Sequence, residues 1–167
     1  MSRYMNLIGQ NARKASLDKV NSRTKNKILK RYAFLLGKEK KSILKANQKD
    51  IQFALGKGLK NNLIERLTID EKKLIGIKNS IDKIANLKDP VDTTLEKWRR
   101  PNGLTISRVS IPIGVIGVIY ESRPNVTSDV ASLCFKSGNA VILKGGSEAI
   151  NTNKILAKLF RKSLKEN

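Results

Sequence analysis

The sequence contains no histidine and one cysteine, Cys134. Without histidine, the chain can form no histidine-ligated metal site, and no catalytic step can use an imidazole as its general base. One cysteine permits no disulfide bond within the chain, so a reducing cytoplasm is the expected location. Residues 1–6 show no signal-peptide core, and no run approaches the roughly 18 apolar residues of a membrane-spanning helix. We therefore expect no membrane association.

Aromatic residues are also scarce, at 5% of the 167 residues. The core must therefore be built from Ile, Leu, Val and Ala, a composition that suits helices packed on an aliphatic sheet. The length suits one domain with a core large enough to fold.

Acidic residues are few. The chain has 34 Lys and Arg residues against 14 Asp and Glu residues, so its net charge is +20. Such a field attracts polyanions, so a nucleic-acid-binding protein is one alternative. The positive residues are spread over the whole chain, however, without a basic tail or a helix-turn-helix signature. Nucleic acid is therefore the less favoured partner, and phosphorylated substrates and nucleotides are compatible with the same charge.

Residues 1–88 are predicted to be helical. Apolar residues recur at helical spacing in 27–36, in 42–55 and again after Thr68. Thr68 and Glu71 have the spacing of a capping box, which predicts that a helix starts at Thr68. The lysines fill the opposite, solvated faces.

Residues 94–111 are predicted to form a β-hairpin. Pro101, Asn102 and Gly103 supply turn chemistry between two strand-like stretches. The preceding Asp89-Pro90 breaks the helical pattern.

Residues 112–167 are predicted to form a βαβα unit. The apolar run 115–120 is typical of a strand buried on both faces. A helix over 126–137 and a second apolar run, 140–143, follow, and the chain becomes helical again from Glu148. Short loops between these elements imply parallel strands joined by a right-handed crossover. The expected fold class is α/β, with half of a doubly wound sheet.

The loop after the second strand is the first candidate site, because ligands of open α/β sheets bind at the carboxyl ends of the strands. Lys144 is a cation, while Gly145 and Gly146 allow close approach to the backbone. Ser147 and Glu148 begin a helix, whose free N–H groups favour ribose and phosphate oxygens. The loop matches neither the dinucleotide fingerprint nor the P-loop, so an ordinary turn with an exposed lysine is the alternative.

The loop after the first strand is the second candidate site. Arg123 suits a phosphate or carboxylate, and the Asn125 amide can donate to a developing oxyanion. Alternatively, Asn125 only caps the next helix. Cys134 lies within that helix without a histidine to activate it, so we expect it to be structural.

Three stretches of the sequence resemble one family. Residues 111–127 read IPIGVIGVIYESRPNVT, residues 133–149 read LCFKSGNAVILKGGSEA, and residues 98–103 read WRRPNG. All three are similar to the γ-glutamyl phosphate reductases (glutamate-5-semialdehyde dehydrogenases) of the aldehyde dehydrogenase superfamily. The resemblance covers the whole chain in order and is strongest over residues 98–149.

The resemblance implies a fold and a domain organisation. The chain would form an incomplete cofactor-binding domain over residues 1–167, with a partial Rossmann-like parallel sheet of the aldehyde dehydrogenase type. Its expected parts are a helical segment (1–88), an oligomerisation hairpin that pairs identical subunits (94–111) and a βαβα unit (112–167). The catalytic domain is expected to be absent from these residues.

The resemblance also implies a reaction. NADPH reduces γ-glutamyl phosphate to glutamate 5-semialdehyde with release of phosphate, in proline biosynthesis, through a cysteine thiolate that forms a thioester. That cysteine is expected to lie beyond residue 167, and Cys134 does not match it. Residues 1–167 alone are therefore expected to be inactive, and a non-catalytic nucleotide-binding or subunit-pairing remnant is the alternative.

The resemblance also implies roles for individual residues, at the positions that match the motifs of the family. Lys144, Gly145, Gly146, Ser147 and Glu148 match the segment that holds the adenosine ribose of the cofactor, and Lys144 with Ser147 would suit the 2′-phosphate of NADP. Asn125 matches the asparagine of the oxyanion hole, and Arg123 is expected to face the substrate. No metal is expected.

Overall fold

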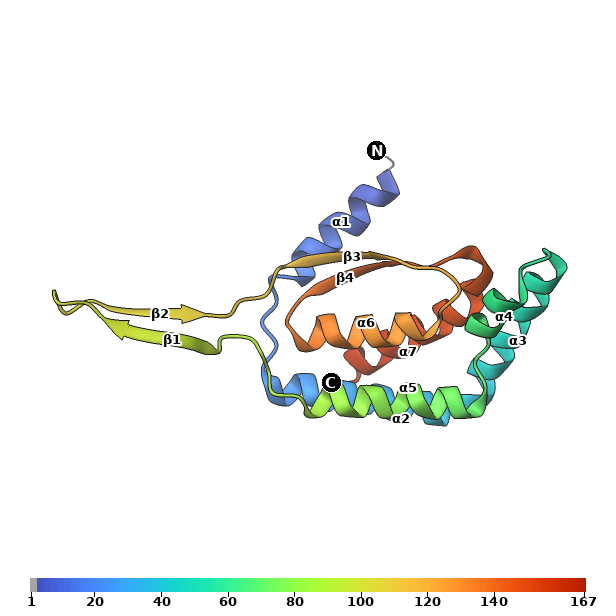
Figure 1. Cartoon of the computed structure of the whole chain (residues 1–167), viewed down its shortest axis with the longest axis horizontal. Helices are drawn as coiled ribbons and strands as arrows, with labels where there is room; N and C mark the ends of the chain where they lie inside the picture. Colours follow the sequence, from blue (N-terminus) through green and yellow to red (C-terminus); the bar gives the residue numbers. More distant parts are fainter. Residues whose placement is uncertain (1–2) are drawn as a thin grey trace.

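The computed structural model describes residues 3–167, and it shows helices stacked against a small parallel sheet from which a hairpin projects (Figure 1). The amino-terminal helices are α1 (Arg3–Ala15), α2 (Ser22–Lys38), α3 (Lys40–Gly56), α4 (Asn61–Leu67) and α5 (Glu71–Asn86). The hairpin consists of β1 (Thr94–Arg99) and β2 (Thr105–Val109). The remaining elements are β3 (Val115–Ile119), α6 (Asn125–Lys136), β4 (Ala140–Lys144), the 3-10 turn η1 (Ser147–Ala149) and α7 (Ile150–Lys165).

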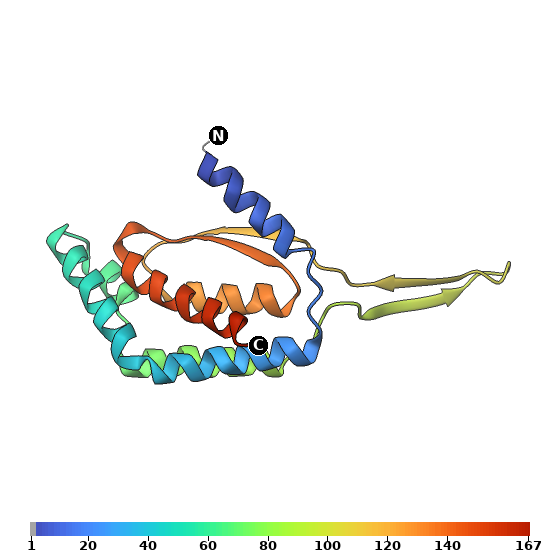
Figure 2. The same cartoon turned by 180° about the vertical axis from the view of Figure 1, so that it is seen from behind.

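The predicted fold class is confirmed. Strands β3 and β4 are parallel, and Val115 to Ile119 pair in register with Ala140 to Lys144. Seen from both sides, α6 and α7 lie beneath this sheet, and α2 and α5 form the next layer (Figures 1 and 2). A helix therefore connects the two strands across one face, as a right-handed crossover requires.

The prediction that the first strand is buried on both faces is wrong. Ile119 is 82% exposed, and Gly117 is also exposed. The reason is that α6 and α7 cover only one face, while α1 reaches the other face beside β4. The apolar run marks a strand with two hydrophobic faces, of which residues 3–167 bury one.

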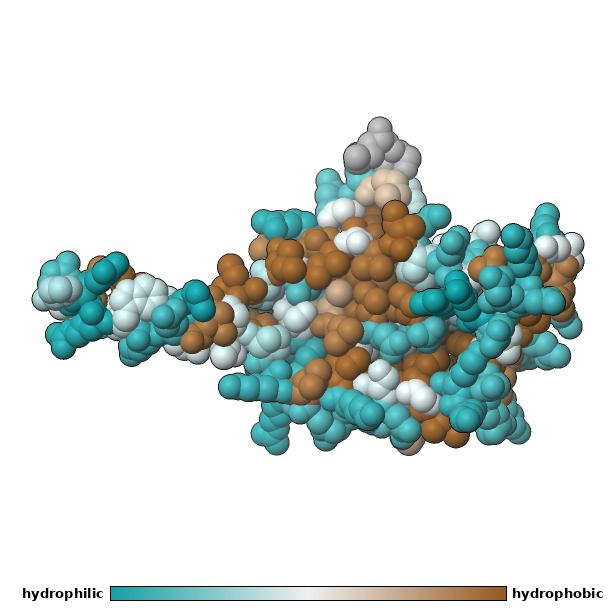
Figure 3. All heavy atoms as spheres, in the orientation of Figure 1, coloured by the Kyte–Doolittle hydropathy of each residue, from teal (hydrophilic) through white to brown (hydrophobic). Residues whose placement is uncertain are grey.

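Apolar side chains are consequently visible on the surface. Figure 3 shows them gathered over α1, the sheet and the base of the hairpin. Ile111 is 76% exposed, Ile113 is 83% exposed and Tyr4 is 68% exposed. Across the described residues, no helix is both long and apolar enough to span a membrane.

The main core lies between the lower helix layer and α6–α7. Its buried side chains are mostly aliphatic, as the composition predicted, and α2 supplies Leu29, Tyr32, Leu35 and Leu36. The Tyr32 hydroxyl lies 2.7 Å from Ser128 Oγ and donates to the Leu156 carbonyl at 3.3 Å. Burial raises the pKa of Tyr32, so this hydroxyl stays protonated and ties α2 to α6 and α7.

The predicted capping box is wrong in its position. The N-cap of α5 is Asp70, whose carboxylate accepts from Lys73 N at 2.6 Å. Thr68 instead ends α4, and its hydroxyl donates to the Ile64 carbonyl at 2.8 Å. The helix start lies two residues later than predicted because the chain is extended at Thr68 and Asp70, between the end of α4 and the start of α5.

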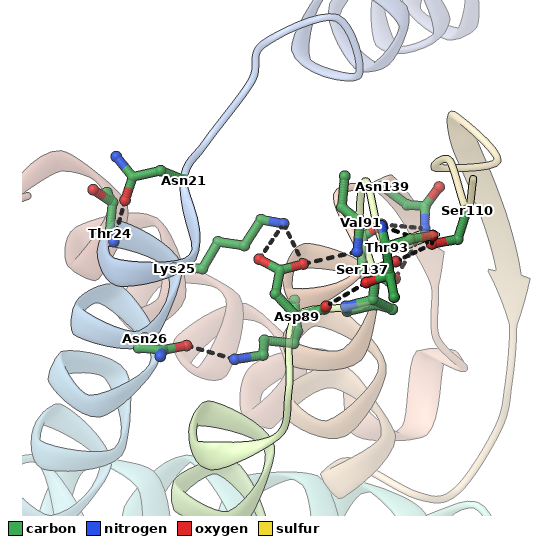
Figure 4. A network of polar contacts seen from close by, with 12 residues as sticks. Asn21, Thr24, Lys25, Asn26, Asp89, Val91, Thr93, Ser110, Ser137 and Asn139 are labelled. Carbon is green, nitrogen blue, oxygen red and sulfur yellow. Dashed lines mark hydrogen bonds and ion pairs between the residues drawn. The ribbon is translucent and has the colours of Figure 1, made fainter. Parts of the chain in front are cut away.

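A buried ion pair fixes the connection from α5 to the hairpin (Figure 4). Lys25, which is 2% exposed, contacts Asp89 Oδ2 at 2.9 Å, and Val91 N donates to Asp89 Oδ1 at 3.0 Å. Burial pushes the pKa of Asp89 upward, but these hydrogen bonds and the Lys25 charge outweigh burial and lower that pKa. The carboxylate therefore stays ionised and balances a lysine that would otherwise be a buried, unpaired charge.

The hairpin itself extends into solvent. Gly103 adopts a φ of +85°, which glycine tolerates, and Gly103 N donates to the Arg100 carbonyl at 2.9 Å to close the turn. At the other end, Ser110 bonds to Pro90 and Thr93 and joins the two strands to the body of the molecule.

Two polar residues of α3 connect the helical segment to the α/β unit. Asp50 is 1% exposed and accepts from Asn151 N at 3.1 Å and from Thr152 N at 2.7 Å. The side chains of Asn151 and Thr152 donate to the same carboxylate at 2.8 and 2.6 Å. Asp50 thereby satisfies the free N–H groups at the start of α7, from a position about one hundred residues earlier in the chain.

Asn47 lies one turn earlier on α3 and is also 1% exposed. Its amide donates to the Leu67 carbonyl at 2.9 Å, and its oxygen accepts from Ile69 N at 2.7 Å. The same amide lies 3.3 Å from Thr152 Oγ1. Asn47 and Asp50 together set the positions of the α4–α5 connection and of α7.

We expect the substitution Asp50→Asn to cost about 2–4 kcal/mol of unfolding free energy, because an amide NH₂ in place of either oxygen would face one backbone donor and one side-chain donor in a buried site. Urea denaturation of the natural full-length protein measures this cost. Asp70→Asn is the matched control, since Asn is an equally good cap at an exposed helix start and should cost at most about 1 kcal/mol. Equal losses for the two variants would contradict the role given to Asp50.

Candidate functional site

The two predicted loops meet at the carboxyl ends of β3 and β4. Glu148, in η1, reaches across to the loop that follows β3. Ser122 N donates to Glu148 Oε1 at 2.5 Å, and Ser122 Oγ donates to the same oxygen at 3.1 Å. The structure therefore brings together the two loops that the sequence singled out, and Glu148 is the side chain that joins them.

Ser122 has an unusual backbone. Its φ is +48°, in the left-handed region that residues with a Cβ rarely adopt, and it is 4% exposed. Burial pushes the pKa of Glu148 upward, but hydrogen bonds from its own backbone N–H and from Ser122, together with the Lys144 charge, lower it overall. An ionised Glu148 thus stabilises a strained turn directly before Arg123 and Asn125.

The two glycines of the second loop are required by neighbouring side chains. A Cβ on Gly145 would lie 2.3 Å from Asn153 Nδ2 and 3.2 Å from the Tyr120 ring. A Cβ on Gly146 would lie 2.1 Å from a Glu148 carboxylate oxygen. Gly146 therefore makes room for the carboxylate that holds Ser122, and Gly145 makes room for a buried amide.

A chain of side-chain hydrogen bonds fixes the loop at the end of β3. The Tyr120 hydroxyl lies 2.6 Å from Thr127 Oγ1, which donates to Asn153 Oδ1 at 2.9 Å. Burial raises the pKa of Tyr120, so its hydroxyl stays neutral. These contacts connect β3, α6 and α7, and they set the position at which α6 begins.

Lys144 and Ser147 remain open to solvent at this edge. Both side chains are exposed, and neither makes a hydrogen bond to the described residues. Their ammonium and hydroxyl groups are the donors that a ribose phosphate would use. The Glu148 carboxylate is an acceptor and is engaged by Ser122, so within this loop Lys144 and Ser147 are the side chains whose donors are open to an anionic group.

Arg123 and Asn125 lie on a separate cleft of about 460 Å³ between α4–α5 and the start of α6. Asn125 is the first residue of α6, and the residue in the N-cap position is Pro124. The Asn125 amide donates to Asp129 Oδ2 at 3.1 Å, so the alternative that Asn125 serves as a helix cap is wrong. The other residues that line the cleft are Arg66, Thr68, Ile69, Lys73, Gly76, Ile77, Ser80 and Asp129.

Cys134 is buried within α6, as expected for a structural cysteine. Burial raises the pKa of its thiol, which keeps the sulfur protonated and weakly nucleophilic. Within residues 3–167, no group of three Cys, Asp or Glu residues comes together as a possible metal site.

Four polar residues of these sites were not predicted from the sequence. Tyr120, Thr127 and Asn153 form a chain of hydrogen bonds. Asp129 lines the cleft beside Asn125. Only Asp129 left a signal in the sequence, since an acidic residue four positions after Asn125 lies on the same face of a helix. The other three are ordinary residues whose partners are distant in the chain.

Comparisons with known proteins give one family. No family model matches the chain. A γ-glutamyl phosphate reductase of Hydrogenobaculum sp. is 51% identical over 150 residues, which are 90% of this chain and 34% of that protein. The crystal structure of the γ-glutamyl phosphate reductase of Thermotoga maritima matches with a TM-score of 0.90 and 41% identity, over 95% of this chain and 39% of that one.

The wider fold is that of the aldehyde dehydrogenases. A probable aldehyde dehydrogenase of Listeria monocytogenes matches over 97% of this chain and 33% of its own, with a TM-score of 0.66 and 16% identity. The chain spans about a third of the length of the curated relative described above. The resemblance to the amino-terminal part of γ-glutamyl phosphate reductases is thus confirmed.

The two loop glycines should differ in their tolerance of a methyl group. We expect Gly145→Ala to cost about 1–3 kcal/mol, because the buried Asn153 amide and the Tyr120 ring cannot both move away. Gly146→Ala should cost less, about 1 kcal/mol, because the flexible end of the Glu148 side chain can shift and only its hydrogen bonds to Ser122 are lost. Thermal unfolding compares the two variants.

Gly146→Ala should instead release Ser122 from Glu148. Hydrogen exchange at the Ser122 amide should become faster in Gly146→Ala than in the natural protein. An unchanged exchange rate, or equal stability losses at the two glycines, would show that these side chains do not impose the requirement for glycine.

Proposed function

We propose that the protein to which these residues belong is an NADP-dependent γ-glutamyl phosphate reductase, which reduces γ-glutamyl phosphate to glutamate 5-semialdehyde with release of phosphate in proline biosynthesis. The observation that carries the proposal is the 51% identity, over 90% of this chain, to a protein of that name. The meeting of the two loops at the strand ends supports it, because ligands bind there in open α/β sheets.

Residues of the cleft would act on the substrate. The Asn125 amide has two N–H groups, of which one donates to Asp129. The other is available to a carbonyl oxygen that gains charge during attack on an acyl phosphate. The exposed Arg123 guanidinium, two residues earlier, suits the phosphate. Cys134 takes no part, because its thiol is buried in α6.

Residues of the β4 loop would hold the cofactor. NADPH supplies the hydride when bound. Lys144 and Ser147 are exposed at the end of β4 and suit a phosphate on the adenosine ribose, while Gly145, Gly146 and Glu148 give the loop its shape. The single buried thiol, which forms no disulfide, agrees with a reducing cytoplasm.

The cofactor assignment predicts a selective effect of Lys144. In the natural full-length protein, Lys144→Met should raise the KM for NADPH about tenfold, the size of one charge-assisted hydrogen bond, and leave the KM for NADH unchanged. Steady-state kinetics with both cofactors measures the difference. Lys158→Met is the matched control, since Lys158 is exposed on α7 and lies outside the loop. An equal change for both cofactors would contradict a 2′-phosphate contact.

We also propose that the hairpin joins two copies of the protein. It projects from the body, and its large side chains Leu95, Trp98, Leu104 and Val109 are 58%, 37%, 57% and 42% exposed. A two-stranded hairpin is marginally stable alone, and its unpaired edges favour pairing with another strand.

Light scattering tests the hairpin as an interface. The natural full-length protein should be an oligomer, and Leu95→Lys should shift its mass toward the monomer, because a charge would replace an apolar contact. Leu55→Lys is the matched control, since Leu55 is 57% exposed at the end of α3. A natural protein of monomeric mass, or dissociation by both variants alike, would reject the proposal.

A further inference from the structure

The cleft beside Asn125 contains a carboxylate that forms no ion pair with the described residues. Asp129 Oδ2 accepts from Asn125 Nδ2 at 3.1 Å. Asp129 Oδ1 is closed off from solvent and makes no hydrogen bond of ordinary geometry among residues 3–167, although the Ser80 side chain also influences this carboxyl. Burial raises the pKa of Asp129, although the side chains of Asn125 and Ser80 offset part of this effect. A partly buried carboxylate without an ion pair is costly, so Asp129, which lines the cleft, favours a positively charged ligand.

The cations of the protein do not fill this role. The Lys73 ammonium donates to the carbonyls of Glu65 and Thr68, at 2.8 Å each, and so closes the end of α4. Arg66 and Arg123 line the same cleft but form no ion pair with Asp129. Both guanidinium groups are exposed and remain available to an anion.

Three groups of the cleft come from neighbouring positions in the chain. Arg123 precedes α6, Asn125 begins it, and Asp129 lies one turn further, about 6 Å along the helix axis. The cleft is therefore lined by a cation, Arg123, and by an amide and a carboxylate that lie 3.1 Å apart, Asn125 and Asp129. A γ-glutamyl phosphate molecule presents groups complementary to all three, which are a phosphate, an acyl oxygen and an α-ammonium group at the far end of a short aliphatic chain.

We propose that Asp129 binds the α-ammonium group of the substrate, with the acyl oxygen at Asn125 and the phosphate at Arg123. This inference rests on the proposed function. It makes Asp129 the residue that distinguishes an amino-acid substrate from an aldehyde or acyl phosphate of the same length without the amine.

The reverse reaction tests the assignment in the natural full-length protein, with inorganic phosphate and NADP⁺. Two aldehydes serve as probes, which are glutamate 5-semialdehyde and 5-oxopentanoate, its analogue without the amino group. For Asp129→Asn, kcat/KM for the first aldehyde should fall about 10- to 100-fold, the range of a charge-assisted hydrogen bond, and kcat/KM for the second should stay within about twofold.

A second measurement separates binding from folding. Asp129→Asn should unfold at the same temperature as the natural protein or at a higher one, because it removes a partly buried charge that forms no ion pair, while its amide oxygen can still accept from Asn125. Asp18→Asn is the matched control, since it removes the same charge from an exposed position outside the cleft and should leave both aldehydes unaffected.

The outcomes distinguish this inference from the proposed function. If the natural protein oxidises neither aldehyde, the reductase function itself is wrong. If the natural protein is active and Asp129→Asn loses activity toward both aldehydes equally, or toward neither, Asp129 does not recognise the amine and the inference is overturned.

Discussion

The carboxylate of Asp50 joins the two parts of the molecule, and much of the rest of the structure depends on it. It is buried on α3, yet it accepts four hydrogen bonds from Asn151 and Thr152 at the start of α7. A helix start leaves several N–H groups unpaired, and a buried start requires an acceptor from elsewhere in the fold. Because α7 follows directly from the β4 loop, Asp50 helps to set the position of this loop relative to the helical segment, together with Asn47 and Tyr32.

The positions of the loops at the strand ends depend on this placement of α7. Glu148 lies two residues before α7 and holds Ser122 in a left-handed conformation, which turns the chain from β3 into α6. Asn153, in the first turn of α7, meets Thr127 of α6 and packs over Gly145. Hydrogen bonds from α3, α6 and α7 therefore fix both candidate sites, although neither site is built from α3. Catalytic geometry of this kind needs such support, because small displacements of a donor weaken it strongly.

The amino-terminal helices contribute directly to the cleft. The α4–α5 connection, held by Asn47, lies opposite the start of α6, so residues near positions 66–80 and 123–129 line one cleft. Charge is distributed differently over the surface and in the cleft. Most of the net charge of +20 is spread over solvated helix faces, whereas the cleft contains a small number of placed groups of both signs. The overall charge favours anionic ligands in general, and under our proposal the cleft selects among them.

The sequence by itself determined the α/β class, the hairpin, the parallel strands and the two loops at their ends, because hydrophobic period and turn residues are local properties. It also determined the family, through the stretches around Arg123, Asn125 and Lys144. Only the tertiary structure decided that Asp70 and not Thr68 caps α5, that one face of β3 stays exposed, and that Asn125 faces Asp129. The roles of Asp50, Asn47 and Asn153 likewise depended on partners 20 to more than 100 residues away. Burial and hydrogen bonding between distant segments have no local pattern, since each depends on which other element the fold places opposite.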